Sequence, residues 1–125
     1  MAENEQEKYE GFDRRLFPRL DVSALVEYAI LKILPLKQKS ASKDISAGGI
    51  RFIVREDLKM DTPLSLTIHL PDGGAPVKAK GKIVRKIGTA PSPDGKTEYE
   101  IGVEFSRIKA KDQERIAKYV RQSNK

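Results

Sequence analysis

Three arginines lie close together near the start of the chain, and their spacing suits the binding of an anion. Arg14, Arg15 and Arg19 fall within six residues. Pro18 disfavours a helix there, because proline lacks a backbone N–H and pushes the preceding residue toward extended geometry. A guanidinium binds phosphate oxygens two at a time and also stacks on a nucleobase. The segment is therefore either a phosphate-binding cluster or a solvated basic linker.

A second polar group follows further along the chain. Asp44, Ser46 and Gly49 form a D-x-S-x-x-G pattern, with Gly48 directly before the last glycine. In an ordinary turn, the Asp and Ser side chains bond local backbone and the glycines adopt positive φ. In a binding site, the carboxylate would instead accept hydrogen bonds from the N1–H and N2–H edge of guanine, and Ser46 would add a hydroxyl. The pattern alone leaves both interpretations open.

The remaining residues offer little for catalysis. The absence of cysteine excludes disulfides, a thiol nucleophile and Cys-based metal sites. The single histidine, His69, falls on the polar face of its strand and is expected on the surface. Glu98, Glu100 and Glu104 share one strand face, where we expect solvated side chains rather than a catalytic carboxylate pair. No residues show metal-ligand spacing, so we expect no enzyme, no metal and no cofactor.

Alternation of apolar and polar residues predicts the elements that must position these groups. The D-x-S-x-x-G pattern ends one predicted strand, and Pro71-Asp72-Gly73-Gly74 predicts a hairpin between two others. Residues 88–96 form a loop by composition. The six expected strands cover residues 20–31, 36–46, 50–54, 64–70, 77–83 and 97–106.

The hydrophobic period changes only after the sixth strand. Ile116, Tyr119 and Val120 recur at the spacing of one helix face, which predicts a C-terminal helix at about residues 110–122. Six short strands followed by one helix indicate an antiparallel β-barrel or sandwich, with the helix over one opening or edge. We expect a single domain over residues 13–125.

The charge of the chain is positive and unevenly distributed. The 125 residues carry 24 Lys and Arg against 18 Asp and Glu, a net charge of +6, which favours a phosphate-bearing or polyanionic partner. The first ten residues carry four Glu and one Lys, and residues 1–12 are expected to be a flexible acidic arm. We see no signal peptide and no stretch suited to membrane insertion, so a cytoplasmic protein is expected.

The two motifs together, in this order, resemble the PilZ domain family. R-x-x-x-R at Arg15 and Arg19 is followed by a strand and then by D-x-S-x-x-G. The resemblance runs from about residue 13 to about residue 121, and it includes Gly102-Val103-Glu104-Phe105 and the helix after it. PilZ domains are receptors for the bacterial second messenger cyclic di-GMP. The resemblance implies a six-stranded barrel with the ligand on its outer surface near one end.

The resemblance also implies roles for individual residues. The two arginines of R-x-x-x-R would grip phosphates and contact guanine, the Asp and Ser would read a guanine edge, and the glycines would keep the turn tight. The arginine directly before the motif would add a contact, and in the family a basic residue there tends to accompany two stacked ligand molecules. The implied ligand-binding residues are Arg14, Arg15, Arg19, Asp44, Ser46, Gly48 and Gly49.

The expected function is a non-catalytic, stand-alone receptor in the bacterial cytoplasm. Ligand phosphates would neutralise the mutual repulsion of the arginines and order residues 1–19, which would create a surface for a protein partner. The alternative is a basic β-barrel that binds single-stranded nucleic acid through Lys78, Lys80, Lys82 and Lys86. Such sites usually interleave aromatic side chains, whereas this chain has no Trp and only 4 Tyr and 4 Phe.

Overall fold

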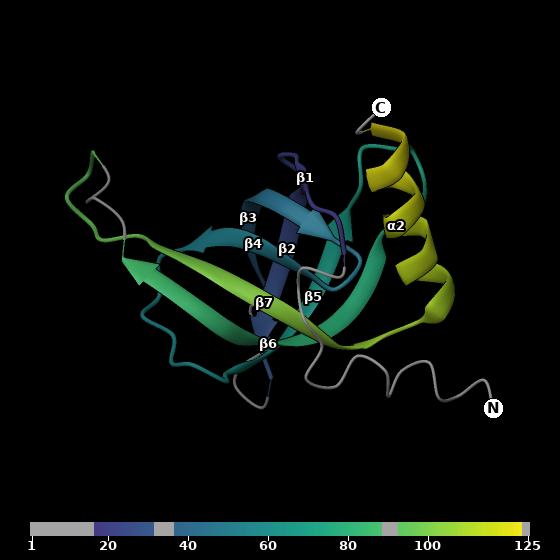
Figure 1. The fold of residues 1–125 in the computed structure, drawn as a ribbon. Helices are drawn as coiled ribbons and strands as arrows, with labels where there is room; N and C mark the ends of the chain where they lie inside the picture. Colours follow the sequence, from purple (N-terminus) through teal and green to yellow (C-terminus); the bar gives the residue numbers. More distant parts are fainter. Residues whose placement is uncertain (1–16, 32–36, 89–92, 124–125) are drawn as a thin grey trace.

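The fold consists of seven β-strands and one helix in a computed structural model, which describes residues 17–31, 37–88 and 93–123 (Figure 1). Predicted features on the remaining residues, including the acidic arm at 1–12, lie outside the described part. The elements are β1 (Leu20–Asp21), β2 (Leu25–Ile30), β3 (Gln38–Ser46), β4 (Gly49–Val54), β5 (Pro63–His69), β6 (Val77–Gly88), β7 (Tyr99–Ile108) and α2 (Ala110–Ser123).

The strands close into a barrel. Their order is β1-β3-β2-β5-β6-β7-β4, all pairs are antiparallel, and a further pairing of β3 with β4 closes the ring, with β1 added on the outside of β3. The six longer strands, β2 to β7, form this ring, which confirms the predicted six-stranded antiparallel barrel. The described part of the chain contains no helix long and apolar enough to cross a membrane.

The first predicted strand is divided in two, which the sequence pattern did not show. Between β1 and β2, the side chain of Ser42 replaces part of the strand pairing. Its hydroxyl accepts a hydrogen bond from Ala24 N at 2.8 Å and donates to the carbonyl oxygen of Val22. The β3–β4 register shifts between Ser42 and Asp44, so the barrel bends here and brings β1 alongside Asp44.

One face of each long strand fills the barrel interior. The alternation that predicted the strands matches the burial, because Ile101, Val103 and Phe105 on β7 are buried. Burying a side chain of this size stabilises a fold by about 1.5–3 kcal/mol. The largest fully buried side chains include Phe52, Ile45, Ile50, Leu64, Leu66, Ile68, Ile83, Ile101 and Ile116.

The C-terminal helix packs on the same core and beside the turn of the D-x-S-x-x-G motif. Ile116 and Val120 are fully buried in the core cluster, which confirms the predicted apolar face. The buried amide of Gln113 donates from Nε2 to the carbonyl oxygen of Ala47 at 2.9 Å. The helix therefore holds the β3–β4 turn in place from one side.

An ion pair joins the same helix to the hairpin between β5 and β6. Arg115 donates two hydrogen bonds to Asp72, from Nε at 3.0 Å and from Nη2 at 2.8 Å. The backbone N–H of Gly74 donates a third at 2.9 Å. The hydrogen bond from Arg115, followed by that from Gly74, lowers the pKa of Asp72 to about 2.

This pKa predicts a specific dependence of stability on pH. Because the folded pKa lies below the unfolded value of about 3.9, the stabilisation is complete above about pH 4 and is lost as the pH falls toward about 2. Solvent screening limits it to about 1 kcal/mol. Asp72→Asn should lower the free energy of unfolding by this amount at pH 7 and by much less at pH 2, as measured by urea unfolding. An equal loss at both pH values would contradict the assignment.

Candidate functional site

The candidate site lies where β1, β3, β4 and β7 run side by side on the outside of the barrel. The β3–β4 hairpin pairs Ser46 with Gly49, Ile45 with Ile50, and Asp44 with Arg51. Asp44 is only 4% exposed, although it carries a carboxylate. A buried carboxylate is stable only when hydrogen bonds or opposite charges compensate for its lost hydration, so its partners define the site.

Two guanidinium groups balance the negative charge of the buried Asp44 carboxylate. Arg19 Nη1 lies 2.7 Å from Asp44 Oδ1, and Arg51 Nη2 lies 2.7 Å from Asp44 Oδ2. Arg51 Nη1 also lies 2.8 Å from Glu100 Oε2 on β7. We call Arg19, Asp44, Arg51 and Glu100 the arginine–carboxylate network. It alternates positive and negative charges across four segments of the chain, so each charge is balanced locally.

Ser46 takes the structural role that a turn would give it. It is almost fully buried, and its hydroxyl accepts a hydrogen bond from the N–H of Gly48 at 3.2 Å and lies 3.5 Å from the carbonyl oxygen of Gly49. The carbonyl oxygen of Gly48 accepts a hydrogen bond from the N–H of Phe105 at 3.0 Å. Ser46 therefore fixes the turn internally, and Gly48 holds it against β7.

Gly49 is required for close packing rather than for its backbone angles. A Cβ atom built on it would lie 2.3 Å from the backbone oxygen of Val103. Among the described glycines, positive φ occurs at Gly73 and Gly95 and not in the D-x-S-x-x-G turn. The turn interpretation is thus wrong in assigning positive φ to these glycines. At Gly49, the close approach of β4 to β7 is what excludes a side chain.

The structure brings together residues from both predicted motifs. Arg19 of R-x-x-x-R contacts Asp44 of D-x-S-x-x-G, and the glycine turn follows two residues later. Arg14 and Arg15 lie outside the described residues, so their positions stay predictions. The part of the chain that is described contains no group of three or more His, Cys, Asp or Glu side chains placed to hold a metal ion.

Arg51 and Glu100 belong to the network, but the motifs did not identify them. Arg51 lies in the strand expected at residues 50–54, outside both motifs. A two-residue turn at residues 47 and 48, however, places residue 51 directly opposite residue 44 in the hairpin. The hairpin pattern in the sequence could therefore have identified Arg51 as a neighbour of Asp44. Glu100 was expected to be solvated, but its side chain is only 19% exposed. That expectation is wrong, because the ion pair with Arg51 holds Glu100 against the barrel.

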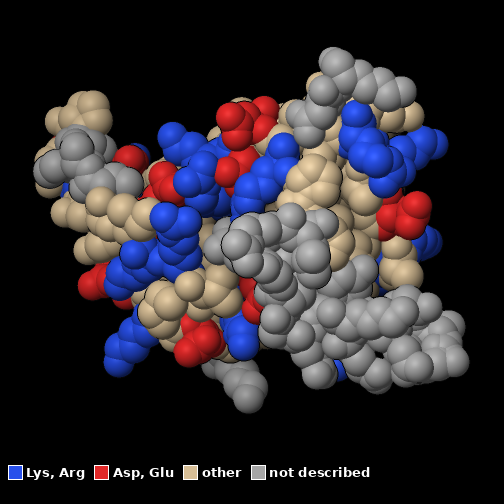
Figure 2. All heavy atoms as spheres, in the orientation of Figure 1, with Lys and Arg blue, Asp and Glu red and all other residues tan. Residues whose placement is uncertain are grey.

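Other polar residues from the sequence are paired outside the network. His69 Nε2 lies 3.1 Å from Glu27 Oε1, and this hydrogen bond lowers the pKa of Glu27. Glu98 lies 3.7 Å from Arg55. Basic and acidic side chains are interspersed on the face shown in Figure 2. Charge on this face is therefore balanced locally rather than gathered in one basic track.

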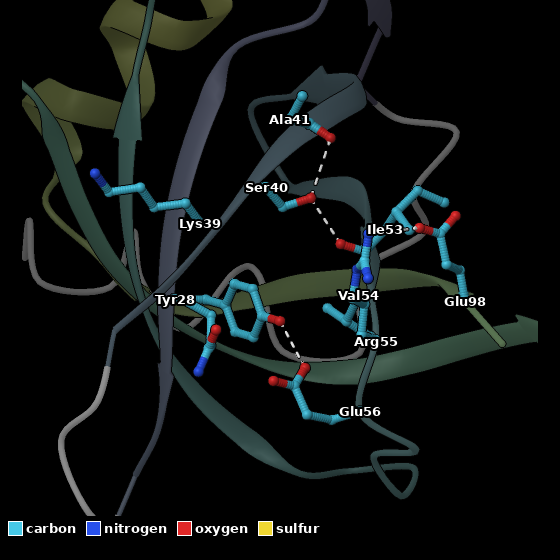
Figure 3. A pocket seen from close by; sticks show the side chains of 10 residues that line it. Tyr28, Lys39, Ser40, Ala41, Ile53, Val54, Arg55, Glu56 and Glu98 are labelled. Carbon is cyan, nitrogen blue, oxygen red and sulfur yellow. Dashed lines mark hydrogen bonds and ion pairs between the residues drawn. The ribbon is translucent and has the colours of Figure 1, made fainter. Parts of the chain in front are cut away.

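A pocket of about 440 Å³ opens where β3 and β4 diverge beyond the pair of Ser42 with Phe52 (Figure 3). Tyr28 donates its hydroxyl hydrogen to Glu56 Oε1 at 2.6 Å, and Ser40 Oγ donates to the carbonyl oxygen of Ile53 at 2.6 Å. Burial and the Glu56 hydrogen bond raise the pKa of Tyr28. The pocket lining includes neither Asp44 nor its partners, so it is separate from the network.

Comparison with known proteins identifies the family. Residues 13–122 match the PilZ domain, whereas the comparison with curated proteins gave no match. The Bacillus subtilis inhibitor of motility (MotI/DgrA) shares 26% identity at a TM-score of 0.69, covering 91% of this chain and 54% of that one. The K. pneumonia MrkH–c-di-GMP complex shares 21% identity at a TM-score of 0.70, covering 90% and 52%.

The PilZ domain of Escherichia coli YcgR with c-di-GMP shares 9% identity at a TM-score of 0.66, covering 90% of this chain and 95% of that domain. This chain thus spans about half the length of MotI/DgrA and MrkH, and nearly all of the isolated YcgR domain. The sequence match extends from the R-x-x-x-R segment to the C-terminal helix. The chain belongs to the PilZ domain family.

Proposed function

We propose that this chain is a non-catalytic receptor for cyclic di-GMP. The observation that carries the proposal is the contact between Arg19 and Asp44, which are 25 residues apart. Each residue comes from a motif that suits a different part of a guanine dinucleotide, and the fold places Arg19 of one motif against Asp44 of the other. PilZ domains of other proteins, such as YcgR, have been solved with c-di-GMP.

The proposed site matches the chemistry of the ligand. Cyclic di-GMP carries two phosphates and two guanines, so it needs cations, hydrogen-bond acceptors and stacking surfaces. Arg14, Arg15 and Arg19 supply the cations, and their planar groups also stack on bases. Asp44 supplies the acceptor for a guanine edge. Gly49 keeps the turn flat against β7, so that the ligand approaches the backbone closely.

Ligand binding is proposed to act by ordering residues 1–19. Three arginines in a short segment repel one another, and bound phosphates would remove this repulsion and draw the segment onto the barrel. The ordered segment would present a new surface to a protein partner in the bacterial cytoplasm. Nucleic acid is the less favoured ligand. Lys86, one of the four lysines that would bind it, already pairs with Asp57, and its Nζ lies 5.1 Å from the ring centre of Tyr99.

Hydrogen exchange measured with and without cyclic di-GMP tests this ordering. The amides of residues 13–19 should exchange several-fold more slowly at saturating ligand, because the segment then packs on the barrel. The amides of β5 provide the internal control and should not change. Unchanged exchange over residues 1–19, with binding shown by calorimetry, would exclude the ordering mechanism and leave binding itself intact.

A further inference from the structure

We propose that Arg51 is a positioning residue for guanine recognition, and that Arg19 is the partner that the ligand displaces from Asp44. This inference rests on the proposed function and assigns different roles to the two guanidinium groups. Arg51 would keep the Asp44 carboxylate in one orientation throughout. Arg19 would leave Oδ1 when guanine arrives and would transfer to a phosphate.

The backbone of Arg51 is fixed on both sides. It lies within β4, where its Cα partners are Asp44 on β3 and Gly102 on β7. Gly102 has no side chain, so the path from Arg51 across β7 to Glu100 is open at that position. A residue paired on both sides of a closed barrel cannot shift without breaking strand pairing, so Arg51 is a fixed reference for Asp44.

The guanidinium group of Arg51 is held by two carboxylates. Nη2 contacts Asp44 and Nη1 contacts Glu100, at 2.7 Å and 2.8 Å. Its Nε is buried and has no hydrogen-bond partner within the described residues. The orientation of the group therefore depends on Asp44 and Glu100 together, and Glu100 anchors the side of Arg51 that faces away from Asp44.

The position of Arg19 is less constrained. It lies before β1, immediately after Pro18 and outside any strand, and it contacts Asp44 Oδ1 through Nη1. The next residues pair with β3 only over Leu20 and Asp21. A shift of this segment disturbs strand pairing only at β1, whereas a shift of β4 breaks its pairing with both β3 and β7, so Arg19 is the partner that exchanges.

The exchange preserves the hydrogen bonding of Asp44. A carboxylate has about four acceptor positions, so Oδ2 accepts from Arg51 and from one guanine N–H at the same time. Oδ1 then accepts the second guanine N–H in place of Arg19. The guanine N1–H and N2–H thus meet two oxygens whose plane Arg51 has already fixed. Without Arg51, the carboxylate would rotate and would form poorly aligned hydrogen bonds with the two N–H groups.

The test compares two ligands that differ at one group. Cyclic di-IMP carries hypoxanthine, which lacks the 2-amino group of guanine, so the ratio of its Kd to that of cyclic di-GMP reports recognition of N2–H. In the unmodified chain, we expect this ratio to be about 10 or more, as expected for a hydrogen bond to a charged group. Arg51→Met should weaken cyclic di-GMP binding about tenfold, and the ratio of the two Kd values should fall to about 1.

Arg55→Met is the matched control. Arg55 lies four residues further along the same chain segment and pairs with Asp94 and Glu98 at 3.1 Å and 3.7 Å, but it does not contact Asp44. This variant loses the same charge and a comparable pair of contacts, and it should keep both Kd values. Glu100→Gln retains Arg51 and removes its anchor, so the ratio should fall part of the way. If Arg51→Met does not fold, Glu100→Gln tests the positioning role of Arg51 in its place.

The outcomes separate the two proposals. If Arg51→Met, or Glu100→Gln in its place, keeps the ratio of the unmodified chain, the positioning role of Arg51 is wrong and the receptor function stands. If Arg55→Met lowers the ratio equally, a general loss of charge explains the effect and the role of Arg51 is again wrong. If the folded, unmodified chain does not bind cyclic di-GMP, the proposed function itself fails.

Discussion

Replacing Arg19 with alanine is expected to weaken cyclic di-GMP binding by about 30- to 700-fold, which corresponds to about 2–4 kcal/mol. The proposed reason is the loss of a charge-assisted contact to a ligand phosphate, where arginine binds two oxygens at once. Arg19 lies 2.7 Å from Asp44, so it is already placed at the site before ligand arrives. Isothermal titration calorimetry gives the Kd of each variant directly.

Arg107→Ala is the control for this experiment. Arg107 is an exposed arginine on β7, and its loss changes the net charge equally without touching the arginine–carboxylate network. Binding should then be unchanged within about twofold, because surface substitutions have small effects. The Arg19→Ala variant should remain folded, since Asp44 keeps Arg51. If both variants bind as the unmodified chain does, Arg19 is not part of the ligand site.

Replacing Gly49 with alanine is expected to lower the free energy of unfolding by about 2–4 kcal/mol. The new Cβ would lie 2.3 Å from the backbone oxygen of Val103. That oxygen belongs to β7, which pairs with β4 along its length, so neither strand moves without breaking inter-strand hydrogen bonds. Thermal unfolding should show the loss as a fall in Tm of about 8 °C or more.

Gly88→Ala is the matched control, because a Cβ at Gly88 would meet no atom within 4 Å and its φ is not positive. The control should change stability by no more than about 0.5 kcal/mol. Gly49→Ala should also weaken ligand binding, since the displaced turn carries Ser46 and continues into Asp44. A Tm equal to that of Gly88→Ala would show that β4 and β7 have room at this position, contrary to the structure.

The sequence predicted most of the fold because the barrel interior imposes strict alternation. β3, β4, β5 and β7 lie within about two residues of their expected ranges, whereas β6 continues to Gly88, past the expected end at residue 83 and into the expected loop. The helix was expected at about 110–122 and runs from Ala110 to Ser123. The break between β1 and β2 was not predictable, because the alternation continues through Val22 and Ala24. Only the hydroxyl of Ser42, which is distant in sequence, reveals the break.

The candidate site was predicted only in part, for a related reason. Arg19 and Asp44 belong to short motifs, so their residue types and spacing identify them. Arg51 and Glu100 enter the site through strand register, which places Arg51 opposite Asp44 and near Glu100. The ion pair of Arg51 with Glu100 leaves no local pattern in the sequence, whereas the pairing of Arg51 with Asp44 follows from the hairpin. Short motifs and the hairpin therefore located most of the candidate site, whereas Glu100 required the fold.

Calorimetric titration of the folded chain with cyclic di-GMP tests whether the chain is a receptor for this ligand. We expect saturable binding with a Kd near the micromolar range, equivalent to about −8 kcal/mol, and a near-complete loss of binding in an Asp44→Ala variant that still unfolds cooperatively. Asp44 contacts both guanidinium groups of the network, so its replacement tests the site directly. Absence of binding by the folded chain would show that it is not a cyclic di-GMP receptor, and unchanged binding by Asp44→Ala would show that Asp44 is not part of the ligand site.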